Sequence, residues 1–151
     1  MLSESEVIWW PKFENIFDAF AAENENFSGL KNMVEIPAEL KVGKVILRGK
    51  IDRVVINEKE ELIILDYKTG QIPSKSDVIS GLNPQLTIAA LILEDKPISY
   101  LGYWKLSSSS GSEIKKISDN QEEIYDLIFA AQVGLKKLFE FFADEKNGYL
   151  A

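Results

Sequence analysis

Three side chains that can do chemistry lie in one stretch of the sequence, Gly49–Gly70, and they are Asp52, Asp66 and Lys68. Two runs rich in β-forming residues flank the polar residues 57–60, a pattern that predicts a β-hairpin. When the strands pair about the middle of that turn, Asp52 faces Asp66 across the hairpin. Lys68 follows Asp66 by two residues and therefore emerges on the same face, because strand side chains alternate.

This arrangement of charges predicts a metal site. Like charges at facing positions of two strands, about 5 Å apart, destabilise a sheet. A divalent cation between the carboxylates turns that repulsion into binding, since hard cations prefer carboxylate oxygens. Two facing carboxylates and an ammonium group are the parts of a metal-dependent phosphodiesterase site. The alternative is an exposed hairpin whose charged face is only solvated; the facing aspartates and the glycines at both ends weigh against it.

The absence of cysteine and histidine narrows the possible chemistry. Without cysteine the chain of 151 residues, long enough for one domain, forms no disulfide, zinc–thiolate site or iron–sulfur cluster. Without histidine, Ser-His and Cys-His nucleophilic catalysis is excluded and metal ligands must be oxygens, which favours Mg²⁺ or Mn²⁺ over Zn²⁺. The chain also lacks an apolar run of membrane-span length and a signal-peptide pattern, so we expect a cytoplasmic protein with no membrane partner.

The net charge of −7 counts against a stand-alone nucleic-acid binder, whose surface is usually basic. Basic residues nevertheless gather around the first strand of the hairpin, at Lys41, Lys44, Arg48, Lys50 and Arg53. Arg48 and Lys50 share a strand face with Asp52. This face is either a DNA-facing surface or an ordinary polar sheet face, and charge alone does not separate the two.

Alternation and helical spacing predict the elements that carry these residues. In chain order we expect a helix over 9–27, strands over 33–40, 44–55 and 61–68, helices over 74–82 and 85–94, a strand over 98–106, a turn over 107–112 and a long helix from 119 onward. Ser74 is the expected N-cap of the helix over 74–82. This order predicts one α/β domain with a mixed central β-sheet flanked by helices.

Both long helices carry apolar stripes. In the first, Pro11 suits the opening turn, and four residues at helical spacing predict a core-facing side: Phe13, Ile16, Phe17 and Phe20. Trp9 and Trp10 are interpreted as hydrophobic anchors. In the last helix the stripe from Ile124 to Phe142 also predicts core packing.

Three motifs stand out together: Gly49–Arg53 reads Gly-Lys-Ile-Asp-Arg, Ile63–Gly70 reads Ile-Ile-Leu-Asp-Tyr-Lys-Thr-Gly, and Pro84–Leu86 reads Pro-Gln-Leu. In combination they resemble the PD-(D/E)XK nuclease superfamily in its RecB-like branch. The likeness is strongest to the C-terminal nuclease domains of AddB, a subunit of bacterial helicase–nucleases, and covers about Trp9–Leu106. It implies a restriction-endonuclease-like core in one domain over 1–151, which we expect to be the C-terminal part of a longer protein.

The resemblance implies roles for individual residues. Asp52 and Asp66 would be the metal ligands, joined by the backbone carbonyl of Tyr67. Lys68 would orient or activate the attacking water and offset phosphate charge.

The implied activity is cleavage of DNA phosphodiester bonds by a Mg²⁺- or Mn²⁺-dependent exonuclease in double-strand break repair and recombination. DNA would be the substrate, and a helicase–nuclease subunit of the AddA type would be the partner. Gln85 and Arg53 would contact the substrate, although Gln85 is equally readable as a polar residue that opens a helix.

The sequence departs from the RecB-like pattern in two places. The upstream metal-binding histidine is missing, and Ala89 stands where many of these nucleases carry a tyrosine. Glu35 or Glu39 would be a substitute acid, or else an ordinary solvated strand residue. Two alternatives therefore stay open: a catalytically impaired nuclease-like module that binds DNA or acts as a scaffold, and a generic interaction domain, which predicts no binding of Mg²⁺ or Mn²⁺.

Overall fold

The computed structural model describes residues 4–109 and 111–144, which form a five-stranded sheet and four α-helices. A short 3-10 turn, Glu25–Phe27, follows the first helix. The elements are α1 (Glu4–Asn24), β1 (Lys31–Val42), β2 (Val45–Ile56), β3 (Leu62–Lys68), α2 (Lys75–Ile79), α3 (Gln85–Ile92), β4 (Ile98–Ser107), β5 (Gly111–Ser118) and α4 (Gln121–Ala143).

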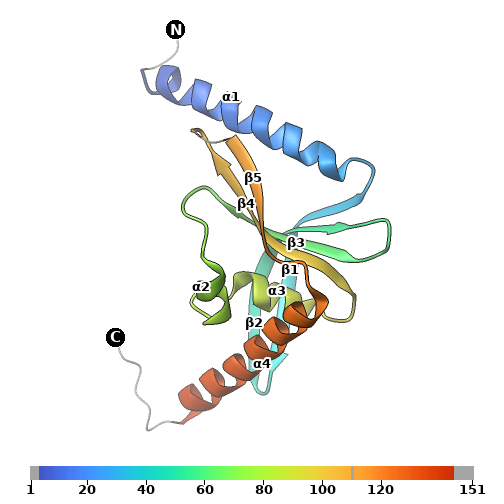
Figure 1. The fold of residues 1–151 in the computed structure, drawn as a ribbon. Helices are drawn as coiled ribbons and strands as arrows, with labels where there is room; N and C mark the ends of the chain where they lie inside the picture. The colour runs from blue at the N-terminus through green and yellow to red at the C-terminus, as the bar shows by residue number, and fades with distance from the viewer. Residues whose placement is uncertain (1–3, 110, 145–151) are drawn as a thin grey trace.

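The sheet is mixed, as the sequence predicted. Its strand order is β1-β2-β3-β4-β5, and β3 pairs with β4 in parallel while the other neighbours are antiparallel. Figure 1 shows α1 on one side of the sheet and α2, α3 and α4 on the other. No helix within the described residues is long and apolar enough to cross a membrane.

Each face of the sheet has its own core. The larger core lies under α3 and the start of α4, and its fully buried members include Val54, Ile64, Leu86, Leu101 and Ile124. The smaller core lies under the end of α1 and consists of Phe27, Val55, Ile63, Leu65 and Trp104. Neighbouring residues of β2 and β3 therefore alternate between two buried environments, as strand geometry requires.

The hairpin has the register that the sequence predicted. Arg53 pairs with Leu65 and Ile56 with Leu62, and the next position along this ladder sets Asp52 opposite Asp66. The turn is closed by Asn57, whose side-chain Oδ1 accepts hydrogen bonds from two backbone N–H groups within it. An asparagine that satisfies the turn in this way holds the register of both strands.

The crossover from β3 to β4 positions the residues that follow the β2–β3 hairpin. The predicted cap of α2 is confirmed, since Ser74 accepts from the N–H of Asp77 at 3.1 Å and Asp77 Oδ2 accepts from the N–H of Ser74 at 2.9 Å. After α3, β4 returns parallel to β3 with Tyr103 beside Asp66.

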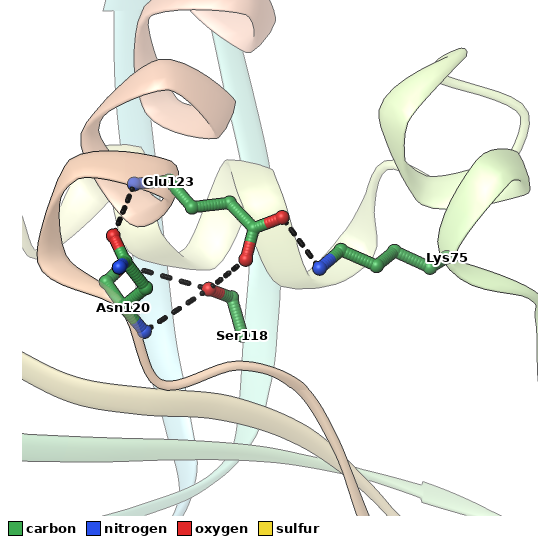
Figure 2. Close-up of polar contacts among 4 residues, drawn as sticks. All are labelled: Lys75, Ser118, Asn120 and Glu123. Carbon is green, nitrogen blue, oxygen red and sulfur yellow. Dashed lines mark hydrogen bonds and ion pairs between the residues drawn. The ribbon is translucent and has the colours of Figure 1, made fainter.

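A polar network joins α2 to the segment where β5 leads into α4 (Figure 2). Glu123 accepts from Lys75 Nζ at 2.5 Å and from Ser118 Oγ at 2.5 Å, while Asn120 caps α4 by accepting the N–H of Glu123 at 3.0 Å. The network links α2, the end of β5 and the start of α4. It thereby holds α2, the first helix after β3.

The first helix differs from its prediction. It begins at Glu4, so Pro11 lies inside the helix rather than in its opening turn. Phe13 and Phe17 are 58% and 57% exposed, and of the predicted stripe Phe20 packs best, with its ring stacked on Trp104 at 4.9 Å between centroids. The stripe does face the sheet, but across an open groove to which the sheet contributes only Tyr67 and Leu106. Trp9 and Trp10 are exposed as well.

Two differences concern the C-terminal third. Residues 111–118, part of which was predicted as a turn, form the edge strand β5; residue 110 lies outside the described residues. In β5 the adjacent Lys115 and Lys116 interrupt the apolar–polar alternation that would have predicted a strand. In α4 the stripe is buried at Ile124, Leu127 and Ile128 but exposed at Leu138 and Phe142, because the helix runs on past the sheet (Figure 1).

Candidate active site

Two carboxylates meet on neighbouring strands. Asp52 Oδ2, on β2, accepts the backbone N–H of Tyr67 at 2.9 Å, and Tyr67 directly follows Asp66 on β3. Asp66 is 8% exposed, and its Oδ2 is a buried atom without a hydrogen bond of good geometry. Its close neighbour is Lys68 Nζ, at 2.8 Å. The predicted convergence of Asp52, Asp66 and Lys68 is therefore present in the fold.

The electrostatics of Asp66 favour an additional cation. Burial raises its pKa; attraction to Lys68 opposes this effect, and the charge of Asp52 adds to it. The net effect is still a raised pKa of Asp66, although the ammonium group of Lys68 is in contact with its carboxylate. A carboxylate that is buried beside a second carboxylate is stabilised by any further positive charge.

Lys68 is held from three sides. Its Nζ donates to Gln85 Oε1 at 2.6 Å, pairs with Asp66, and lies 5.6 Å from the ring centre of Tyr103. Gln85 is the first residue of α3, so the predicted motif residue does reach the site, where it contacts the lysine. An ammonium group fixed by an amide, a carboxylate and a ring has little freedom to reorient.

Tyr103 is a site residue that the sequence reasoning missed. It is completely buried, its hydroxyl has no hydrogen-bond partner within the described residues, and burial together with the charges of Asp66 and Asp77 raises its pKa to about 12. Its place beside Asp66 depends on the parallel pairing of β4 with β3. Strand alternation alone carries no signal for such a long-range pairing.

A pocket of about 360 Å³ opens beside the two carboxylates, between β2, β3 and α3. Asp52, Asp66 and Gln85 line it, and the rest of the wall is mostly apolar or small, including Leu47, Ile51, Leu86, Ala89 and Ile92. Arg48 and Lys50 stand on its β2 side. A concave, mostly apolar space with a few convergent polar groups is typical of a ligand site.

The two candidate substitute acids lie on β1 and contact these same cations. Glu39 Oε2 accepts from Arg48 Nε at 2.8 Å, and Glu35 Oε2 accepts from Lys50 Nζ at 2.7 Å. All four side chains are exposed. The contacts of Glu35 and Glu39 are thus with arginine and lysine, and neither lines the pocket.

The structure does not bring Arg53 to the pocket. The side chain points to the opposite face of the sheet, where it is 4% exposed and lies over the rings of Phe27 and Trp104 at 5.2 and 4.9 Å. The alternation of strand side chains explains this, because Arg53 directly follows Asp52.

The donor set suits a hard divalent cation. Asp66 Oδ2 is a buried oxygen whose close contact is Lys68 Nζ at 2.8 Å, and Asp52 supplies a second carboxylate from the facing strand. Across residues 4–109 and 111–144, no group of three or more acidic, histidine or cysteine side chains gathers at one point. The side chains would therefore supply two ligands, and backbone oxygen or water would complete the coordination.

Several known proteins are similar to this chain. An uncharacterized protein of Rickettsia typhi, RT0391, is 34% identical over 84 residues, and one of Rickettsia conorii, RC0550, is 40% identical over 88 residues. Each match covers 53% of this chain and 10% of the relative, so the chain spans about a tenth of the relatives' length.

A solved structure titled "Crystal structure of SSO0001" aligns with a TM-score of 0.45 at 13% identity, over 87% of this chain and 70% of that one. The model of the PD-(D/E)XK nuclease superfamily matches residues 8–147, a range that contains every site residue described above. The mixed α/β fold agrees with that family's restriction-endonuclease-like core. This chain therefore belongs to the PD-(D/E)XK nuclease superfamily.

Proposed function

We propose that the chain is a metal-dependent DNA exonuclease domain of the RecB-like, AddB-like kind, acting in double-strand break repair and recombination. The observation that carries the proposal is that Lys68 contacts Asp66, which lines the pocket together with Asp52 of the facing strand. Membership of the superfamily supports nuclease chemistry, a DNA substrate and use of a divalent metal.

In this proposal Asp52, Asp66 and the backbone carbonyl of Tyr67 hold Mg²⁺ or Mn²⁺. When bound, such an ion supplies a Lewis acid and lowers the pKa of coordinated water. Lys68, fixed by Asp66 and Gln85, orients the attacking water and offsets the negative charge that develops on the phosphate. Gln85 thus acts on the substrate through the lysine that it holds.

The pocket supports action on DNA ends. Its volume of about 360 Å³ lies in the usual range for sites that enclose small ligands, so it has room for a nucleotide at a strand end beside the carboxylates. The net charge of −7 gives little non-specific affinity for DNA, which favours delivery of the end by a partner. We therefore propose a longer parent protein and a helicase–nuclease partner of the AddA type.

The activity is tested on end-labelled linear DNA and closed circular DNA, with Mg²⁺ or Mn²⁺ and with EDTA. We expect slow, metal-dependent release of nucleotides from linear DNA only, faster when the parent protein or its partner is present. Asp66→Asn should abolish it, whereas Asp119→Asn, which alters an exposed carboxylate paired with Lys116, should not.

The second candidate, a catalytically impaired module that binds DNA or acts as a scaffold, is favoured by the lack of a third acidic ligand within the described residues. It predicts metal-independent DNA binding by the parent protein without cleavage under any of these conditions. That result would overturn the proposed exonuclease.

A further inference from the structure

The strongest unexplained feature is the buried cation of Arg53. Within the part of the chain that the structure describes, its polar contacts are all with neutral groups: Nη2 donates to Asn24 Oδ1 at 2.6 Å and to Asn32 Oδ1, and Nη1 donates to Tyr67 Oη at 3.2 Å. Its Nε is buried with no hydrogen-bond partner. A charge placed in a core without an opposing charge is costly, so stability alone explains it poorly.

The contact with Tyr67 connects Arg53 to the candidate active site. Arg53 directly follows Asp52 and Tyr67 directly follows Asp66, so each pair of neighbours puts one residue on each face of the sheet. On the pocket face Asp52 Oδ2 accepts the backbone N–H of Tyr67 at 2.9 Å. On the opposite face Arg53 holds the hydroxyl of the same tyrosine.

Aromatic packing keeps both partners in place. The Tyr67 ring lies 5.5 Å from the ring centre of Trp104 and 6.2 Å from that of Phe20, and the guanidinium of Arg53 lies over Trp104 at 4.9 Å. Asn24 ends α1, Asn32 lies on β1 and Tyr67 on β3, so the hydrogen bonds of the guanidinium join β2 to these three elements. Side chains packed in this way have little room to adopt other rotamers.

We propose that Arg53 and Tyr67 form a clasp behind the active site that sets how β2 and β3 approach each other, and hence how the carboxylates of Asp52 and Asp66 converge on a divalent cation. Both are positioning residues that touch neither substrate nor metal through their side chains. This inference rests on the proposed function, because the carboxylates are taken as the metal ligands.

The test measures two quantities in variants of the whole 151-residue chain. Electron paramagnetic resonance monitors Mn²⁺ binding, and thermal denaturation gives the melting temperature. Tyr67→Phe removes only the hydroxyl of the clasp and keeps the backbone carbonyl. Arg53→Met removes the guanidinium while keeping a side chain that packs on rings, and Arg53→Lys tests whether charge alone suffices. Tyr100→Phe, a change in the same aromatic cluster, is the matched control.

We expect Tyr67→Phe to weaken Mn²⁺ binding about 3-fold to 10-fold, the effect of one hydrogen bond, and to lower the melting temperature by only a few degrees. Arg53→Met should weaken it further and Arg53→Lys should restore little, while Tyr100→Phe should bind as the wild type does. In cleavage assays the metal concentration for half-maximal rate should rise more than the maximal rate falls.

The proposal is overturned when Tyr67→Phe binds Mn²⁺ as tightly as the wild type, or when Tyr100→Phe weakens binding equally. Asp66→Asn separates this failure from failure of the proposed function. If Asp66→Asn abolishes binding and Tyr67→Phe leaves it intact, only the clasp is wrong; if Asp66→Asn leaves binding intact, the assignment of the metal site itself is wrong.

Discussion

Replacing Asp66 by asparagine should stabilise the metal-free protein near neutral pH. The variant keeps the shape of the side chain but removes one of two facing like charges, a pair that destabilises a sheet by roughly 0.2–1 kcal/mol. The lost ion pair with Lys68 works in the opposite direction, yet that lysine keeps its 2.6 Å hydrogen bond to Gln85. The pKa of Asp66 is raised despite Lys68, so the folded state disfavours the charged carboxyl and the net sign is stabilising.

The same pKa shift sets the pH dependence. Because the folded pKa lies above the unfolded value, the penalty for charged Asp66 is present near neutral pH and is relieved as pH falls through the folded pKa. The advantage of Asp66→Asn should therefore shrink on acidification. For a domain of this size about 1 kcal/mol moves the melting temperature by about 2–4 °C.

Adding Mg²⁺ should make the wild type more stable than Asp66→Asn, the reverse of the order expected in EDTA. At ten times its dissociation constant, Mg²⁺ stabilises the wild type by about 1.4 kcal/mol through binding to the folded state, and the variant gains almost nothing. Thermal denaturation followed by circular dichroism, in EDTA and in excess Mg²⁺, measures both effects. A variant that is less stable than the wild type in EDTA near pH 7, or one that Mg²⁺ stabilises equally, would refute the reasoning.

Three further predictions concern the chemistry and the supports of the site. Lys68→Ala should lower the turnover of DNA cleavage by about 100-fold or more with little change in melting temperature, and an equal loss in Lys105→Ala, its neighbour on β4, would remove Lys68 from its special role. Glu123→Gln should lower the melting temperature near neutral pH, where hydrogen bonds from Lys75 and Ser118 hold the pKa of Glu123 below its usual range, and the difference should vanish as pH falls through that folded pKa. Trp104→Ala should reduce the free energy of unfolding by about 3–5 kcal/mol in urea denaturation, because it empties the smaller core; a loss below about 1 kcal/mol would contradict that packing.

The hairpin was predictable because its signals are local. Strand alternation and the polar turn at Asn57 set the register, and the register alone sets Asp52 opposite Asp66. The cap of α2 was predictable for the same reason, because Ser74 and its partner Asp77 are only three residues apart. Local patterns thus gave the central part of the candidate site, whereas the order of the elements along the chain gave the mixed character of the sheet.

The rest depends on contacts between distant parts of the chain. The parallel pairing that brings Tyr103 beside Asp66 has no signal in the sequence of either strand. The edge strand β5 was not predicted because its adjacent lysines break the apolar–polar alternation. The apolar spacing in α1 correctly gave the face that turns toward the sheet. It carried no information on how little of the sheet lies beneath Phe13 and Phe17.

The Gly49–Arg53 motif sends side chains to both faces of the sheet, and the sequence interpretation considered only the face of Asp52. Alternation predicts that Arg53 points away from Asp52, but the aromatic cluster that receives it is assembled from the end of α1, β3 and β4. The resemblance to the nuclease family implied that Arg53 would contact DNA. In the fold it is buried among rings and amides, where its effect on the site passes through Tyr67.

The central claim, that Asp52 and Asp66 together hold a divalent cation, is tested most directly by counting Mn²⁺ ions bound to the wild type, Asp52→Asn, Asp66→Asn and the control Asp119→Asn in electron paramagnetic resonance titrations. The account predicts one weak site in the wild type and the control, and its loss in both Asp52→Asn and Asp66→Asn with the fold intact by circular dichroism. Equal Mn²⁺ binding by all four proteins would contradict it.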